Sequence, residues 1–341
     1  MTRGKPPLLV IVGPTGVGKT AAAVALARRL PIEVISADSR QVYRGMDVAT
    51  GKPTAEEQRA VAHHLVDVVD PDDRYHAARF RTDAETAIEA IRRRGRLPVV
   101  VGGTGLYIRA LLRGLDPAPG ADPEFRRELA GIAARDGRAA LHAQLAAAEP
   151  AVARRLHPND EVRVVRALER LRSGSAVGEA QVRWRRVDTP WRVTYVGLTL
   201  DRPALVRRLT ARAAAMVEAG LLGEVRRLLS RGYASALPAL QGIGYRQFVE
   251  VALGGLEPGR ALQLMQRDTV RYAKRQLTWF AREPGIEWID VAAAGDAEGV
   301  AAAIEARLHP GESEGGVAPL GQPGASEGGV APLGQMEGGI E

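Results

Sequence analysis

The residues that decide the fold are GPTGVGKTAAAVALARRL at positions 13–30, which follow the apolar run PLLVIV at 7–12. They satisfy the pattern G-x-x-x-x-G-K-[ST], with a predicted strand before it and a predicted helix after it. In such a loop backbone N–H groups face phosphate oxygens, the lysine bridges them and the hydroxyl binds Mg²⁺. The motif indicates a bound diphosphate or triphosphate without deciding between them. The expected phosphate contacts, with Thr20 also as the metal ligand, are Gly13, Thr15, Gly16, Val17, Gly18, Lys19 and Thr20.

Strand and helix patterns alternate around this loop. Apolar runs predict strands at 7–12, 32–36, 97–103, 192–200 and 285–291, and helical periodicity covers 20–30, 83–95, 105–115 and most of 203–282. Between 117 and 190 the chain changes to Ala- and Arg-rich helical segments broken by Pro and Gly. We therefore predict an α/β fold with a P-loop NTPase-like parallel sheet flanked by helices, formed by 1–116 and 191–310, and a helical insertion domain at 117–190.

The composition is that of a soluble globular protein, with 45% hydrophobic and 26% charged residues. No apolar run is long enough to cross a bilayer, and the N-terminus lacks a signal-peptide pattern. The absence of cysteine excludes disulfides and thiolate metal sites. We expect a cytoplasmic protein that does not bind membranes.

The charge is distributed unevenly. Residues 311–341 contain five glutamates and no basic residue, so the remainder carries 47 basic against 35 acidic residues. Such a surplus favours a polyanionic partner. The segment SEGGVAPLGQ occurs at 313–322 and again at 326–335. With little apolar surface to bury, 311–341 is predicted to be a disordered acidic tail rich in Gly and Pro.

Two further clusters carry candidate chemistry. SADSRQVYRGMDVATGKP at 36–53 begins where a strand ends, which is where open α/β sheets place ligand groups. Asp38 there is a candidate general base, although spacing alone favours helix capping by Asp38 and Ser39. In VVVGGTGLYIRALLRGL at 99–115, Thr104 is the one side chain suited to donate to phosphate, with helix-to-strand packing as the alternative. Lys52 is another candidate phosphate contact.

Basic helices suggest RNA as the polyanion. Arg163, Arg166 and Arg170 share one helix face, which could grip phosphates, although charged helix faces are usually only solvated. RYAKRQLTWF at 271–280 sets Lys274, Arg275 and Gln276 among aromatic residues, a mixture that suits single-stranded RNA.

These stretches together resemble the isopentenyl-tRNA transferase (tRNA dimethylallyltransferase) family, in its bacterial form. The resemblance also includes HHLVDVVDPDDRYHAARF at 63–80, HPNDEVRVVRALE at 157–169, RRLTARAAAMVEAGLLGEV at 207–225 and ALQGIGYRQ at 239–247, and it extends to about residue 308. It implies transfer of a dimethylallyl group from dimethylallyl diphosphate to the exocyclic amino nitrogen of the adenosine 3′ of the tRNA anticodon.

The resemblance also implies residue roles. Asp38 is the general base, and Thr104 and Arg212 join Lys19, Thr20 and Mg²⁺ in stabilising the departing diphosphate. The insertion grips the anticodon arm, and the adenine leaves its stack to reach the donor. A glycine replaces the alanine of the family's TAKP at 50–53, which we expect to be harmless. The implied tRNA-binding residues are Asp38, Ser39, Arg40, Gln41, Arg126, Arg163, Arg166, Gly244, Tyr245, Arg246, Lys274, Arg275 and Gln276.

Three other functions remain open. An adenylate isopentenyltransferase would use free AMP and need no RNA grip, and a P-loop kinase or ATPase would turn over ATP. A non-catalytic RNA-binding module would have no use for a complete phosphate loop beside Asp38. We favour the tRNA-modifying enzyme and expect it to be a monomer.

Overall fold

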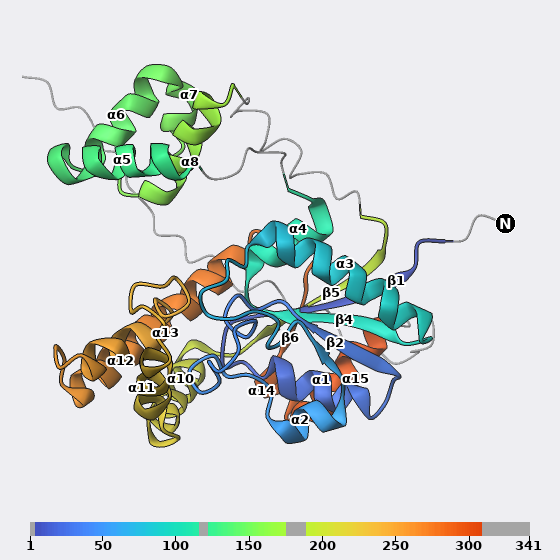
Figure 1. Ribbon diagram of the computed structural model, residues 1–341. Coiled ribbons are helices and arrows are strands. Elements are labelled where there is room, and N and C mark those ends of the chain that lie inside the picture. Colours follow the sequence, from blue (N-terminus) through green and yellow to red (C-terminus); the bar gives the residue numbers. More distant parts are fainter. Residues whose placement is uncertain (1–3, 116–121, 175–188, 309–341) are drawn as a thin grey trace, which may run out of the picture.

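The structure, a computed structural model, describes residues 4–115, 122–174 and 189–308 (Figure 1). Its centre is one six-stranded sheet in the order β3-β2-β4-β1-β5-β6, and every pairing is parallel. The predicted parallel α/β fold is confirmed. Sequence patterns missed only the two-residue strand β3. The strands are β1 Pro7–Val12, β2 Ile32–Ser36, β3 His63–His64, β4 Leu97–Gly102, β5 Arg192–Thr199 and β6 Glu287–Asp290.

Helices cover both faces of the sheet. Along β1, Leu8 and Val10 pack into one hydrophobic cluster while Leu9 and Ile11 pack into another, as the two-residue period of a strand requires. In Figure 1, α3 and α4 lie over one face and α1 and α15 over the other. The covering helices are α1 Lys19–Ala27, α2 Ala55–Ala60, α3 Ala77–Arg93, α4 Gly105–Arg113, α14 Val291–Ala294 and α15 Ala297–Leu308.

Four C-terminal helices extend the α3–α4 side of the core. Figure 1 shows them beside the sheet, with α13 reaching back toward α4. Tyr245, Phe248 and Met265 bury their side chains in the same hydrophobic cluster as α3 and α4. These helices are α10 Arg202–Glu218, α11 Leu221–Ser230, α12 Tyr245–Ala252 and α13 Pro258–Phe280. None of the helices in the described ranges has the length and apolar character needed to cross a membrane.

The described part of the predicted insertion is a helical group with its own hydrophobic core. Leu129, Leu141, Leu145, Val164 and Leu168 are buried in it. Figure 1 shows the group set apart from the sheet, beyond α4. Residues 116–121 and 175–188, and the predicted tail, lie outside the described residues. The helices are α5 Pro123–Asp136, α6 Arg138–Ala148, α7 Pro150–Ala153 and α8 Glu161–Arg172.

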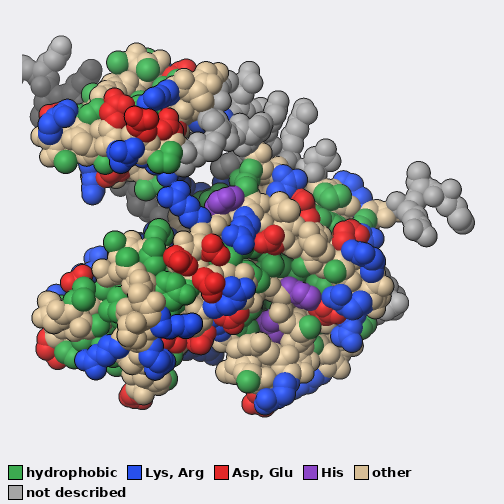
Figure 2. Space-filling model, in the orientation of Figure 1, with side chains coloured by type: hydrophobic (Ala, Val, Ile, Leu, Met, Phe, Trp, Pro, Cys, Tyr) green, Lys and Arg blue, Asp and Glu red, His purple; other side chains and the backbone are tan. Residues whose placement is uncertain are grey.

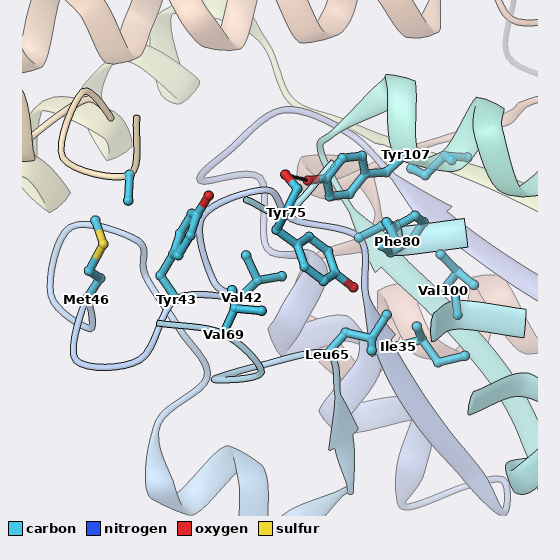
Figure 3. Close-up of a cluster of buried hydrophobic side chains, with 14 of the residues drawn as sticks. Ile35, Val42, Tyr43, Met46, Leu65, Val69, Tyr75, Phe80, Val100 and Tyr107 are labelled. Carbon is cyan, nitrogen blue, oxygen red and sulfur yellow. Dashed lines mark hydrogen bonds between the residues drawn. The ribbon is translucent and has the colours of Figure 1, made fainter. Parts of the chain in front are cut away.

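An aromatic cluster fixes the segment that follows β2 (Figure 3). The rings of Phe80 on α3 and Tyr107 on α4 stack with centroids 4.5 Å apart, and Tyr75 meets Tyr107 edge to face. Figure 3 shows Val42 and Tyr43, which come just after Asp38, on the same cluster. The segment 63–80 therefore supplies a packed support for the loop that carries Asp38.

Leu145→Ala should destabilise the insertion selectively. Its side chain is fully buried, so the cavity should cost about 2–5 kcal/mol. Hydrogen exchange should quicken in α5–α8, while exchange in β1 and β4 should stay unchanged because the sheet has a separate core. Ile11→Ala is the matched change in the sheet and should show the reverse pattern. Equal acceleration of both regions by Leu145→Ala would contradict a separate insertion core.

Candidate active site

The P-loop joins β1 to α1 and leaves the start of α1 open to a ligand. Gly13, Gly16 and Gly18 all have positive φ, from 77° to 146°, a region that L side chains rarely adopt. Gly18 caps α1 without any side-chain hydrogen bond. The first N–H groups of the helix thus remain available to an anion and add the positive end of the helix dipole.

Lys19 places its ammonium over this loop, where it donates to the carbonyl oxygens of Gly13 at 3.0 Å and Pro14 at 2.8 Å. Burial lowers the pKa of Lys19 to about 8, Asp38 opposes this shift, and Arg212 adds to it. A cation stripped of water in this way gains strongly from a neighbouring anion.

A polar cavity of about 400 Å³ lies beside the P-loop. Gly16, Gly18, Lys19 and Thr20 line one side of it. The other side is supplied by the segment 50–54, Glu57, His63 and Arg212. Its size, the Lys19 and Arg212 cations and the open start of α1 suit a diphosphate group, although Asp38 and Glu57 also line it.

Thr20, at the start of α1, is one of two P-loop threonines that line this cavity, the other being Thr15. Within the described ranges, no group of three or more His, Asp and Glu residues could hold a metal ion. Mg²⁺ that is bound through substrate phosphates needs only one or two protein ligands, with water completing its shell. The donor set, a hydroxyl beside a phosphate cavity, fits such an ion.

A second cavity of about 300 Å³ adjoins the first. Thr15, Asp38, Thr50 and Arg212 line both cavities, so Asp38 and Arg212 lie where the two meet. The other residues of the second cavity combine apolar side chains with a polar rim. They include Leu209, Ala213, Met216, Ile243 and Met265, and Ser39, Arg40, Gln241, Arg246, Tyr272 and Arg275.

Asp38 caps a turn instead of the helix that its spacing favoured. Its Oδ1 accepts from the backbone N–H groups of Arg40 at 2.8 Å and Gln41 at 3.4 Å. These bonds fix the carboxylate at the junction of the two cavities. Of the predicted adenine-pocket residues, Ser39 and Arg40 line the second cavity. Gln41 instead lines the phosphate cavity, where its Nε2 donates to the carbonyl of Gly51 at 3.0 Å.

Thr104 supports the Asp38 turn from behind. Its Oγ1 accepts from the backbone N–H of Ser39 at 3.0 Å, and its own N–H donates to the carbonyl of Ala37 at 3.2 Å. Among the described residues that line the two cavities, Thr104 does not appear. The structure thus places Thr104 as a support of Asp38, whereas the sequence suggested a direct phosphate donor.

Arg212 reaches the junction from α10. Burial lowers the pKa of its guanidinium, and the charges of Asp38 and Glu57 oppose that shift. A side chain at Gly51, whose φ is +59°, would overlap the Arg212 guanidinium. Glycine in TGKP therefore suits the position that Arg212 takes here, because the guanidinium occupies the space that a Cβ would fill.

Three residues predicted to contact ligands have their polar groups taken by the protein. Tyr245 is 1% exposed, and its hydroxyl donates to Glu224 at 2.6 Å. Gln276 is 5% exposed and bonds to the P-loop and to Gly103. The ammonium of Lys52 lies between the carboxylates of Asp47 and Asp67. The protein itself thus engages these polar groups, although Lys52 and Gln276 also line the phosphate cavity, and none of the three enters the interface proposed below.

The other predicted RNA contacts on the body lie nearer to solvent. Lys274 and Arg275 are exposed, and Arg275 and Arg246 line the second cavity. Arg246 pairs with Asp268. Gly244 precedes α12 as its cap and has a φ of +92°.

In the insertion, two of the predicted arginines serve the fold. Arg126 binds the carboxylate of Glu169 through two hydrogen bonds, of 2.6 and 3.0 Å, and Arg166 donates to it at 3.0 Å. Glu169 is 3% exposed, so the Arg126 pair ties α5 to α8, while the Arg166 pair lies within α8. Arg163 is exposed, with Asp160 as a weak partner at 3.5 Å. Figure 2 shows Lys and Arg side chains on the surfaces of both the insertion and the body.

Sequence reasoning missed Glu224 and Tyr272. Glu224 on α11 is buried and accepts from the backbone N–H groups of Asp47 at 3.0 Å and Val48 at 3.2 Å, so it holds the segment that carries Thr50. An acidic residue on the apolar face of LLGEV was the available signal. Tyr272 lies one turn before Gln276 on α13 and lines the second cavity.

Comparison with known proteins agrees with this geometry. The family model described as IPP transferase matches residues 41–283, and that described as isopentenyl transferase matches residues 6–67. The tRNA dimethylallyltransferase 1 of Syntrophotalea carbinolica is 50% identical over 84% of this chain and 91% of its own length. The tRNA dimethylallyltransferase of Thermomicrobium roseum is 47% identical over 92% of this chain and 94% of its own.

Solved structures give the same result. The tRNA isopentenylpyrophosphate transferase from Bacillus halodurans is 38% identical with a TM-score of 0.65, covering 90% of this chain and 97% of its own. A eukaryotic dimethylallyltransferase described as acting on tRNA is 28% identical with a TM-score of 0.68, covering 84% of this chain and 74% of its own. The resemblance inferred from the motifs is confirmed, and the chain belongs to the IPP transferase family.

Proposed function

We propose that this protein transfers the dimethylallyl group of dimethylallyl diphosphate to the exocyclic N6 of the adenosine 3′ of the anticodon in tRNAs. The observation that carries the proposal is the meeting of two cavities at Asp38 and Arg212. One cavity has the P-loop and suits the diphosphate. The other has apolar side chains and a basic rim and suits a flipped base with its flanking phosphates.

The reaction forms a bond from N6 to the allylic carbon and breaks the bond from that carbon to the diphosphate oxygen. The diphosphate leaves with the electron pair, and Asp38 accepts the N6 proton. A carboxylate held by two backbone N–H groups is already oriented for this transfer. Lys19, Arg212 and the N–H groups at the start of α1 stabilise the charge that develops on the leaving group.

The metal belongs on the diphosphate side. We assign it as Mg²⁺, with the Thr20 hydroxyl as its protein ligand. The ion supplies additional positive charge to the leaving group. In this arrangement the P-loop holds a product of the reaction, and no ATP is required.

The proposed RNA-binding surface distinguishes this enzyme from an adenylate isopentenyltransferase. Free AMP would need neither the insertion nor the basic rim of Arg40, Arg246 and Arg275. We propose that α13 presents Lys274 and Arg275 to the anticodon loop, while the insertion grips the anticodon arm through Arg163. A cytoplasmic monomer is the form that we propose acts on tRNA.

Purified protein should transfer label from dimethylallyl diphosphate to an anticodon stem-loop with adenosine 3′ of the anticodon. Free AMP, offered in the same mixture, should stay unlabelled because it lacks the phosphates that the basic rim and the insertion would contact. Scintillation counting of the separated RNA and nucleotide gives the ratio. Equal labelling of AMP, or no transfer to RNA, would exclude the tRNA-modifying function.

Asp38→Asn should lower kcat by about 10²–10⁴-fold, because the amide keeps the acceptor for the turn but cannot take the N6 proton. The affinity for RNA, measured by fluorescence anisotropy, should stay within about twofold of that of the unsubstituted protein. Asp70→Asn removes an equally small carboxylate from the surface, where it pairs with Arg44, and is the matched control. Normal turnover of Asp38→Asn would remove Asp38 as the base.

Arg163→Ala should weaken RNA binding and reduce the slope of log affinity against log salt by about one, because one phosphate contact is lost. Arg28→Ala is the control. It removes an exposed arginine at the end of α1, which pairs with Glu298 and lies on the face of the sheet away from the insertion, so it should change neither the RNA affinity nor the salt slope. An unchanged slope for Arg163→Ala would place the insertion arginine outside the RNA interface.

A further inference from the structure

Gln276 on α13 joins two loops of the active site. Its Oε1 accepts from the backbone N–H of Thr15 in the P-loop at 2.8 Å, and its Nε2 donates to the carbonyl of Gly103 at 2.9 Å. Only 5% of its surface is exposed, at the edge of the phosphate cavity that it helps to line. One side chain thus sets the position of the P-loop relative to the turn that carries Thr104.

The fit around this amide is close on both sides. A Cβ at Gly103 would overlap Gln276 Nε2, and a Cβ at Gly105 would overlap the Trp279 indole, one turn further along α13. One turn earlier, Tyr272 hydrogen-bonds to Thr104. Three neighbouring turns of α13, at Tyr272, Gln276 and Trp279, therefore each contact a residue of the 103–105 turn.

The same helix forms a wall of the second cavity. Met265, Thr269, Tyr272 and Arg275 line it, and Thr15 lines both cavities. A base and its phosphates in the second cavity would touch α13 directly. Displacement of α13 would then reach the P-loop through the bond from Thr15 to Gln276.

We propose that Gln276 is a positioning residue that couples occupancy of the second cavity by RNA to diphosphate binding in the P-loop. The inference depends on the proposed function, since it takes RNA and diphosphate as the two ligands. In this proposal Gln276 acts by its position and not on the reacting atoms. It acts through the Thr15 peptide, whose orientation also sets the neighbouring N–H groups of the P-loop. Coupling of this kind is reciprocal, so diphosphate should tighten RNA binding by the same factor.

The test measures the affinity for inorganic diphosphate by calorimetry, with and without an anticodon stem-loop RNA. In the unsubstituted protein, RNA should tighten diphosphate binding by about fivefold or more. Gln276→Met keeps the length and burial of the side chain but loses both hydrogen bonds, and should bring this factor close to one. Gln276→Glu keeps the acceptor for Thr15 and loses the donor to Gly103, and should retain an intermediate factor.

Gln266→Met is the matched control on the same helix. It removes a hydrogen bond from Gln266 to the carbonyl of Thr210 on α10 and leaves the P-loop contact intact, so the factor should be that of the unsubstituted protein. Melting temperature and far-UV circular dichroism check that each variant is folded. If Gln276→Met does not fold, the coupling factor of Gln276→Glu is compared with that of the unsubstituted protein instead.

Three results would overturn the proposal: no coupling in the unsubstituted protein, full coupling in the folded Gln276 variants, or an equal loss in Gln266→Met. Failure of the proposed function looks different. In that case no label is transferred to RNA. Loss of the coupling alone leaves transfer measurable and only raises the concentration of diphosphate needed to saturate the P-loop in the presence of RNA.

Discussion

The parallel pairing of β4 with β1 and β2 is the constraint on which the site depends. Val12 pairs with Gly102 and Ser36 with Val101, so the three strands end at the same edge of the sheet. The P-loop, the Asp38 turn and the 103–105 turn therefore begin side by side at this edge of the sheet, although they are far apart in sequence. The N–H of Ala37 donates to the carbonyl of Val101, and Thr104 returns a bond to the carbonyl of Ala37. Strand pairing and these backbone hydrogen bonds bring Asp38 and the phosphate loop together.

Packing from outside the sheet then holds these loops. Glu224 fixes the segment after the Asp38 turn, and the aromatic cluster of Tyr75, Phe80 and Tyr107 supports it from the other side. α13 completes the frame through Gln276. Many polar side chains near the site thus hydrogen-bond to other parts of the protein, and fewer of them are left to contact a ligand.

The sequence predicted the sheet, the P-loop and Asp38 because each has a local signature: an apolar run, a fixed glycine spacing, or an acidic residue at the end of a strand. It did not reveal contacts that depend on a partner far along the chain. Gln276 and Tyr245 sit among basic and polar residues that suggest RNA contact, yet their partners are Thr15 and Glu224. Arg126 and Arg166 were predicted to grip RNA, and a single buried carboxylate, Glu169, engages them both. No periodicity in the sequence reveals the distant pairs, whereas Arg166 and Glu169 are only three residues apart on α8.

The apolar wall of the second cavity has a chemical consequence. An allylic carbon that loses diphosphate is attacked by any nearby nucleophile, including water, which would waste the donor as a free alcohol. Leu209, Ala213 and Met216 stand beside Arg212 and offer no hydrogen bond to hold a water molecule there. We therefore propose that these three side chains of α10 protect the allyl donor from water, the commonest competing acceptor in the cell.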